Sequence, residues 1–326
     1  MKRELMITAC FAASFFAACQ QEDVDGSFEN LPLSIEANIG NSSGMPVGRY
    51  VGNEPNLATF GSGDAIGLMV NEGSFVKWTY ADSKWSPTVN AVYWKDKVSN
   101  HQFYAFYPYE SKEGMSLTYV PMPDLSIQDG SMSSLAEHDF LVTTKTQAYG
   151  SNGVVSFTKA NGAPFTHVSS LIQINIKGNG DLKNATITGI SIEGKNITTL
   201  SSYSFDNGNV NLDTDPDNAS DELLAEGLNR QMNFTDQTFY FIVNAGTVSL
   251  SDVDLTIAYA SATKKYKAKL QGLGTGTETF VRGKQYSYTL KISDGVLTMT
   301  GNEIKEWETG NNVGEIVING EEQQDE

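Results

Sequence analysis

Cys19 is the residue whose surroundings point most directly to a chemical modification. It follows Phe16-Ala17-Ala18, and small side chains at the two positions before a cysteine resemble the bacterial lipobox, in which the thiol receives a thioether-linked lipid and the chain is cut just before it. Lys2 and Arg3 precede an apolar stretch that is too short to span a bilayer and is typical of a signal peptide. We therefore predict a lipoprotein signal peptide over residues 1–18 and a lipid on Cys19. The alternative is an ordinary cut after Ala18 without a lipid.

The two cysteines predict that the exported chain contains no disulfide. Cys10 lies within the predicted signal peptide, so Cys19 would have no partner. Residues 20–25 are mostly acidic and polar, and such a stretch after a lipidated cysteine resembles the signal that sends some lipoproteins of Bacteroidia to the outer face of the outer membrane. A flexible acidic tether explains the same residues equally well.

Arg49 is a candidate cleavage point. It is the only arginine between Arg3 and Arg230, and it lies in residues 40–62, where Gly, Ser, Asn and Pro predict a loop. Exposed loops of this kind are the preferred sites of proteolytic nicking. Arg49 also fits an ordinary loop or strand residue.

The remaining chemistry-bearing residues do not form an enzyme motif. The histidines, His101, His138 and His167, have no zinc-ligand spacing and no serine in a nucleophile-elbow pattern beside them. Residues 213–222 are rich in Asp and resemble a calcium loop in their oxygen content, but Leu224 stands where an EF-hand has its bidentate Glu. We predict a non-enzymatic protein without a cofactor or metal, and we interpret residues 213–222 as a solvated turn, with a calcium site as the alternative.

Composition excludes some partners. The formal net charge is −17 and the pI is about 4.5, whereas phosphate contacts need clustered Lys and Arg, so nucleic acid is not expected as a partner. No run of apolar residues after Cys19 is long enough to span a membrane as a helix.

The elements that must position these residues are strands. Apolar side chains alternate from Leu31 to Ile39, and short runs rich in Val, Ile, Tyr and Phe then recur every 8–12 residues. We expect a hairpin from Phe75–Tyr80 with the strand at Trp85, a second hairpin from residues 184–192 with 197–205, a helical turn at 133–137 and one short helix at 220–228. This pattern predicts an all-β fold.

The length fits two tandem β-sandwich domains. We place them at residues 50–162 and 163–326, after a tether and N-terminal strand at residues 19–49. A last alternating segment contains Val313, Ile316 and Ile318.

Aromatic residues are concentrated between Trp78 and Tyr109. Rings on alternating strands usually fill a core, which is the interpretation we favour. A sugar-binding platform is the alternative, and Trp85, beside a turn, is the first ring it would use.

Several short segments, in their order along the chain, resemble the fimbrillin family, the type V pilus subunits and related lipoproteins of Bacteroidia. They are Gly63-Asp64-Ala65-Ile66-Gly67-Leu68, Phe103-Tyr104-Ala105-Phe106-Tyr107-Pro108, Asp139-Phe140-Leu141, Phe165-Thr166-His167, Ser170-Leu171-Ile172-Gln173-Ile174, Gly283-Lys284-Gln285-Tyr286-Ser287-Tyr288-Thr289-Leu290 and Ile304-Lys305-Glu306-Trp307.

The resemblance implies two transthyretin-like β-sandwich domains on a surface-exposed lipoprotein of the outer membrane. It further implies that a trypsin-like protease cuts after an Arg beyond the first strand, here Arg49, and that a C-terminal strand of a neighbouring subunit fills the groove left behind. Val313, Ile316 and Ile318 are then candidates for the donor strand, and an ordinary strand of their own domain is the alternative.

The function expected from this resemblance is a structural subunit or adhesin of a type V pilus. Its partners would be other pilus subunits, through strand complementation, and a host or bacterial surface ligand. The alternative function is that of a monomeric outer-membrane lipoprotein that binds glycans for nutrient uptake.

Overall fold

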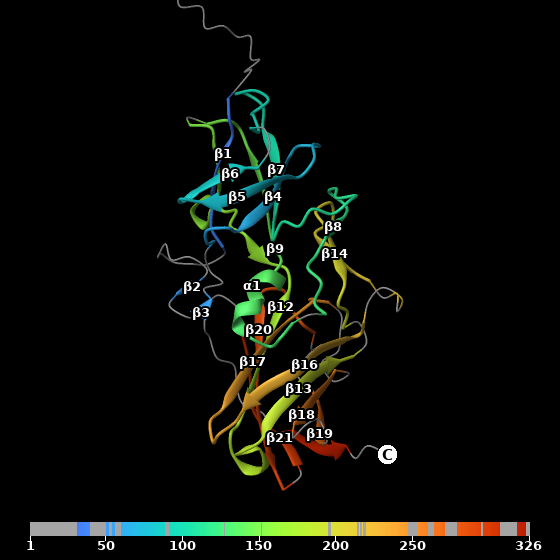
Figure 1. The fold of residues 1–326 in the computed structure, drawn as a ribbon. Coiled ribbons are helices and arrows are strands. Elements are labelled where there is room, and N and C mark those ends of the chain that lie inside the picture. Colours follow the sequence, from blue (N-terminus) through green and yellow to red (C-terminus); the bar gives the residue numbers. More distant parts are fainter. Residues whose placement is uncertain are drawn as a thin grey trace, which may run out of the picture.

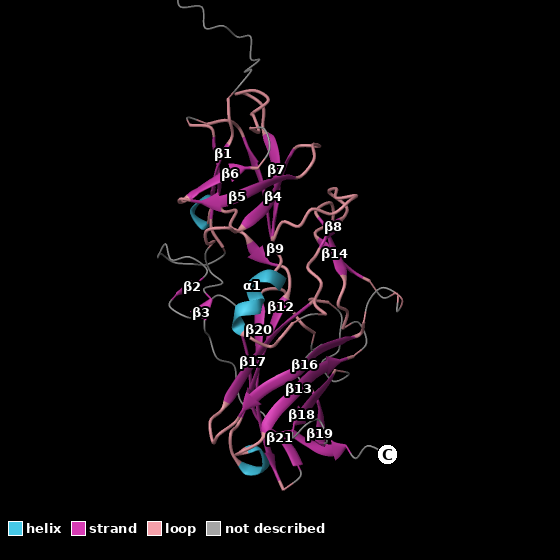
Figure 2. Ribbon diagram, in the orientation of Figure 1, coloured by secondary structure: helices cyan, strands magenta, loops and turns pink. Residues whose placement is uncertain are grey.

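The computed structural model describes residues 31–39, 50–51, 54–55, 60–88, 91–126, 128–150, 152–194, 197–213, 215, 217, 220–246, 253–259, 264–270, 279–294, 296–306 and 318–323. The described chain is almost entirely β, as the sequence predicts (Figure 2). Cys19, Arg49, Val313 and Ile316 lie outside these residues. No helix of the described segments is long and apolar enough to cross a membrane.

A six-stranded antiparallel sheet forms one half of the molecule (Figure 1). Its strands, in spatial order, are β11 (Thr166–His167), β9 (Leu141–Gln147), β7 (His101–Tyr107), β4 (Ala65–Val70), β5 (Val76–Ala81) and β6 (Lys84–Pro87). The β5–β6 hairpin confirms the first hairpin that the sequence predicts. Asp82 and Ser83 in its turn both have positive φ, which is the backbone conformation of the tight turns that match strand twist.

The N-terminal segment lies across from this sheet. Strand β1 (Ser34–Ala37) pairs in parallel with β10 (Val154–Phe157). Isolated bridges extend the segment on either side of β1, from Pro32 to Tyr93 and from Ile39 to Phe165. The core between these layers is aromatic and includes Ile66, Trp78, Trp85, Trp94, Phe103, Phe157 and Phe165.

The buried position of the tryptophans confirms that the aromatic cluster is mainly core. Trp78 and Trp94 are 1% exposed and Trp85 is 7% exposed. The Trp85 ring packs edge-on against Phe60 at a centroid distance of 5.1 Å. Trp85 is therefore unavailable as a platform for a sugar.

A nine-stranded sheet forms the other half. Its spatial order is β16 (Glu222–Gln231), β13 (Thr186–Glu193), β18 (Asp254–Tyr259), β19 (Lys264–Lys269), β22 (Ile318–Gln323), β21 (Val296–Glu306), β20 (Lys284–Ser293), β12 (Ser170–Ile176) and β17 (Gln237–Val243). Only the β12–β20 pair is parallel among these neighbours. Buried residues from both flanks of the sheet join one apolar cluster, so the sheet folds over a single core.

A three-stranded sheet lies between the two halves. It is ordered β15 (Asn209–Leu212), β14 (Ser201–Ser204), β8 (Val120–Pro121). Its apolar side packs on the six-stranded sheet through Val120, Tyr203 and Phe205, against Phe75 and Phe106. The remaining elements are β2 (Tyr50–Val51), β3 (Glu54–Pro55), α1 (Leu135–His138) and three 3-10 turns at Met132–Ser134, Lys159–Asn161 and Gly180–Leu182.

Two sequence predictions in the C-terminal half are wrong. Residues 222–231 form strand β16 rather than a helix, because they pair along β13 and bury alternate side chains such as Leu223 and Ala225. Residues 184–192 and 197–205 do not form a hairpin, since β13 pairs with β16 and β18 while β14 pairs with β15 and β8. The helical turn expected near residues 133–137 is confirmed by α1 and the 3-10 turn before it.

Candidate functional site

The first described segment, Leu31–Ile39, is held as a strand between two other parts of the chain. On one side Leu33 N donates to Val92 O at 2.7 Å and Trp94 N donates to Leu31 O at 3.2 Å. On the other side it follows β10, where Asn38 N donates to Phe157 O at 3.0 Å. Main-chain bonds of this kind depend little on side-chain identity, so another extended segment could make them.

Apolar side chains on one face of this segment complete the aromatic core. Leu33 is 5% exposed and Ile39 is fully buried, while Ile35 and Ala37 are half-buried and pack on the same cluster. Fully burying one Leu or Ile side chain is worth about 1.5–3 kcal/mol. Loss of the segment would therefore open an apolar groove flanked by main-chain groups without partners.

The opposite face of the segment carries a charged contact. Ser156 Oγ donates to Glu36 Oε2 at 3.1 Å, and Lys145 Nζ donates to the main-chain oxygen of Ser156 at 2.7 Å. Burial lowers the pKa of Lys145, and the nearby Glu36 carboxylate opposes that shift. The Glu36 carboxylate thus stabilises the charged form of the Lys145 ammonium group, which is partly shielded from water.

The C-terminal strand occupies an interior place in the other half of the molecule. Strand β22 pairs with β19 through Tyr266–Glu322 and with β21 through Met299–Ile318. Ile318 thus begins a strand of its own chain's sheet. Figure 1 shows β1 at one end of the molecule and β19 and β21, between which β22 pairs, at the other.

The acidic loop uses its carboxylates locally. Asp213 Oδ1 accepts from Asp215 N at 2.9 Å, and Asp215 Oδ1 accepts from Asp217 N at 3.1 Å. Short-range bonds of this type are typical of turns. Within the described ranges there is no group of three or more His, Cys, Asp or Glu side chains that could hold a metal ion.

The three histidines make structural contacts. His138 Nδ1 bonds the Ser134 main-chain oxygen at 2.8 Å. His167 Nδ1 lies 2.7 Å from Asp139 Oδ1, with both side chains buried where the six-stranded sheet ends. These contacts join α1 and strands β9 and β11, and they position no nucleophile.

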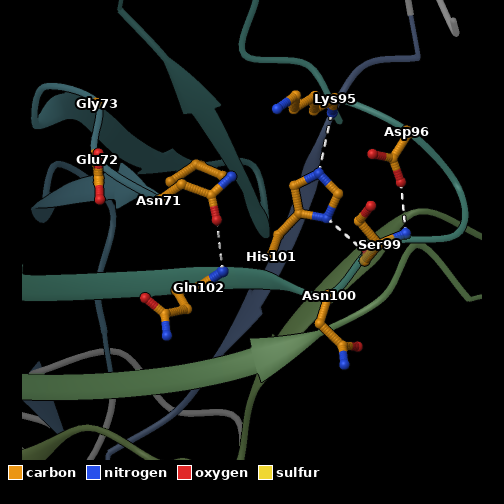
Figure 3. Close-up of a pocket in the computed structure, with 10 residues that line it drawn as sticks. Asn71, Glu72, Gly73, Lys95, Asp96, Ser99, Asn100, His101 and Gln102 are labelled. Carbon is orange, nitrogen blue, oxygen red and sulfur yellow. Dashed lines mark hydrogen bonds between the residues drawn. The ribbon is translucent and has the colours of Figure 1, made fainter.

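A polar pocket of about 560 Å³ lies at the end of the six-stranded sheet, between the β4–β5 turn and the loop before β7 (Figure 3). Most of its polar groups hold the loop in place. Gln102 N donates to Asn71 Oδ1 at 2.9 Å. His101, which is buried, accepts from Lys95 N through Nε2 at 3.2 Å and contacts Ser99 O through Nδ1 at 3.0 Å. The ring therefore fastens both ends of the loop.

The side chain of Asp96, which also lines this pocket, holds the same loop in place. Its Oδ1 accepts main-chain hydrogens from Val98 and Ser99. The hydrogen bonds from Ser99 hold the pKa of the Asp96 carboxyl below its ordinary value. Asn71, Asp96 and His101 thus use polar side-chain atoms to hold the loop that lines the pocket.

These observations define a class of protein: an all-β molecule in which an N-terminal strand completes one layer and a C-terminal strand completes another. A model of the family described as fimbrillin-like matches residues 51–307, and the chain belongs to the fimbrillin-like family. The resemblance seen in the sequence is thereby confirmed.

Two relatives carry fimbrial names. The "Putative fimbrium subunit Fim1C" of Bacteroides uniformis is 23% identical, over 97% of this chain and 98% of its own length. The "Putative fimbrium tip subunit Fim1C" of Bacteroides ovatus is 25% identical over 53% of this chain, a match that spans only 35% of that relative.

Solved structures share the fold. A crystal structure from Bacteroides uniformis, described as a putative cell adhesion protein, superposes with a TM-score of 0.59 at 18% identity, over 85% of this chain and 98% of that one. A second, with the same description and from Bacteroides ovatus, gives a TM-score of 0.57 at 16% identity, over 86% and 99% of the two chains.

Sequence reasoning found the N-terminal strand but missed the residues that hold it. The alternation of Leu33 to Ile39 identifies the strand, whereas Val92, Trp94 and β10 lie far away in the sequence. The residues of β10 are typical of a short strand, but no local signal states that it pairs in parallel with β1.

Proposed function

We propose that this protein is a structural subunit of a type V pilus, or an adhesin carried by one, which joins neighbouring subunits by β-strand exchange. The observation that carries the proposal is the segment Leu31–Ile39, which completes an aromatic core and bonds through its main chain on both edges. Membership of the fimbrillin-like family and the full-length similarity to a fimbrium subunit support it.

In this proposal the chain is exported with residues 1–18 as signal peptide, lipidated on Cys19 and displayed on the outer membrane. Cleavage after Arg49 then releases residues 19–49, which include β1. The remaining chain would consist of two transthyretin-like domains, 50–162 and 163–326. The groove that β1 leaves in the aromatic core then accepts a strand with alternating apolar side chains from a neighbouring subunit.

The donor strand is the C-terminal segment that contains Val313, Ile316 and Ile318. Its alternation supports this role, and β22, which begins at Ile318, pairs with strands at the end of the molecule away from β1. In the free subunit Ile318 lies in β22 within its own sheet, so donation requires that β22 leave β19 and β21.

Limited trypsin treatment of the purified chain tests the proposal. We expect a cut after Arg49, identified by mass spectrometry, followed by a ladder of oligomers on gels run without boiling, because the opened groove can then accept a donor. Arg49→Ala is the matched control and should stay monomeric. A chain that is cut after Arg49, loses residues 31–39 and remains monomeric would contradict strand exchange.

A further inference from the structure

The three-stranded sheet has one covered face and one face that points away from the core. Val120, Tyr203 and Val210 lie in or against the apolar cluster beneath it. The neighbouring positions Pro121, Ser202 and Asn211 are paired directly across the three strands, so their side chains share the other face.

A cavity of about 480 Å³ lies on this outer face. Ligand sites in proteins commonly enclose about 300–1,000 Å³. Its apolar walls come from buried or half-buried side chains, among them Met122, Leu200 and Leu212. Its polar groups include those of Tyr119, Ser202 and Asn211.

Tyr119 supplies an exposed aromatic ring at this cavity. It is 46% exposed, although most rings of this chain are in the core. Its main chain is fixed by a tight turn, in which Ser116 N donates to Tyr119 O at 2.9 Å and Tyr119 N donates to Ser116 O at 3.2 Å. A tyrosine side chain has few rotatable bonds, so it offers a large contact area at a low cost in conformational entropy.

The polar groups beside the ring are open for hydrogen bonding. The Ser202 hydroxyl and the Asn211 amide make no hydrogen bond to other described residues, in contrast to the Asn71 and Asp96 side chains of the pocket in Figure 3. Asn211 is exposed and Ser202 is 9% exposed. The charges here already have partners, since Lys112 Nζ lies 3.2 Å from Glu110 and Asp213 accepts from Asp215 N. What the cavity offers is therefore a ring face, a hydroxyl and an amide with both a donor and an acceptor.

We propose that this face, the Tyr119 site, binds a neutral hexopyranose at the end of a glycan. The apolar C–H face of the sugar would lie on the Tyr119 ring, and its hydroxyls would bond Asn211 and Ser202. An acidic sugar is disfavoured because the protein carries a net charge of −17 and Asp213 lines the cavity. The site is independent of strand exchange, because none of its residues belongs to β1 or β22.

The test is a panel of immobilised glycans ending in glucose, galactose, mannose, N-acetylglucosamine, N-acetylgalactosamine or fucose, with sialylated glycans alongside, probed with the purified full chain. We expect binding to at least one neutral terminus, which titration calorimetry with the corresponding methyl glycoside should reproduce. Tyr119→Ala and Asn211→Ala should each weaken binding by about tenfold, the loss of one stacking or hydrogen-bonding contact.

Two further variants serve as controls. Tyr119→Phe keeps the ring and should retain most of the affinity. Tyr93→Ala is the matched control, because Tyr93 is 45% exposed and lies outside the cavity, and it should bind as the parent does. Absence of binding across the panel, binding only to sialylated glycans, or binding that Tyr119→Ala and Asn211→Ala leave unchanged in folded protein would overturn the proposal.

Discussion

At the scale of single residues, Gly67 shows how closely a side chain of one strand packs on the backbone of the next strand in the six-stranded sheet. Gly67 lies in β4 directly opposite Phe106 of β7, and a Cβ at position 67 would overlap the Phe106 ring. Phe106 is 1% exposed and packs near Phe75 and Phe140, so it has little room to move. The glycine is therefore required by packing rather than by backbone conformation.

We expect Gly67→Ala to lower the free energy of unfolding by about 1–3 kcal/mol, the usual cost of overpacking a core. Gly189→Ala is the control, because Gly189 also lies in a strand, β13, but a Cβ there meets its nearest atoms at 3.5 Å, an ordinary contact. Urea denaturation of both variants measures the difference. Equal stability of the two variants would contradict this account of Gly67.

Asp254 at the start of β18 makes stability depend on pH. Burial disfavours its charged form, but hydrogen bonds from Lys267 and Lys269, at 2.7 and 2.8 Å, outweigh burial and hold the pKa of Asp254 below 3.8. Because the folded pKa lies below the unfolded one, the stabilisation is present above about pH 3.8 and is lost as the pH falls through the folded pKa.

Asp254→Asn should therefore reduce stability near neutral pH by up to about 1 kcal/mol, since both lysines are partly exposed to water. The difference from the parent should shrink as the pH falls below about 4. Thermal melts at pH 7 and pH 3 measure it. An Asp254→Asn difference that grows in acid would exclude the proposed ion pair.

At the scale of elements, strand β22 is the piece that joins the two flanks of the nine-stranded sheet. It pairs with β19 on one side and β21 on the other, so its loss leaves two strand edges unpaired. A chain that ends at Val317 should melt at a lower temperature and should recover when a peptide of residues 313–323 is added. A peptide with Ile316 and Ile318 replaced by Asp is the control. Unchanged melting after truncation would show that β22 contributes little to this sheet.

The elements also show what the sequence could and could not reveal. Alternation identified β1 and the β5–β6 hairpin because both are local patterns. Residues 222–231 are rich in Leu, Ala and Glu, which favour helix, yet they pair with β13 because tertiary contacts outweigh such propensities. The pairing of β1 with β10 and of β22 with β19 joins residues far apart in the chain, and no local signal encodes such a choice.

Of the two candidate sites, one could be predicted from the sequence and the other could not. The strand that completes the aromatic core was predictable from Leu33 and its neighbours, because its period is 2. The sequence drew attention to Trp85, which is buried, whereas the exposed ring beside open polar groups is Tyr119. Which ring is exposed depends on the three-stranded sheet, which brings β8 beside a strand about 80 positions later.

At the scale of the whole molecule, charge opposes association between copies. The full chain has a net charge of −17, and loss of residues 1–49, which carry three basic and six acidic side chains, leaves −14, so cleaved subunits repel one another at low ionic strength. After cleavage at Arg49 we expect the oligomer ladder to form faster when salt is raised from about 0.01 M to about 0.15 M, because the Debye length falls from about 30 Å to about 8 Å. Gel densitometry over time measures the rate, and the uncut chain is the control. Slower assembly at the higher salt concentration would contradict this electrostatic account.

If residues 31–39 fill a groove that another strand can occupy, a chain that lacks them should bind the same residues supplied as a separate peptide. A chain that starts at Tyr50 is mixed with a labelled peptide of residues 28–40, and binding is followed by fluorescence anisotropy and by thermal melting. We expect one-to-one binding that raises the melting temperature, with no binding to the full chain and none by a peptide carrying Leu33→Asp and Ile39→Asp. Equal binding to the full chain, or a Tyr50 chain that is as stable as the full chain and ignores the peptide, would contradict it.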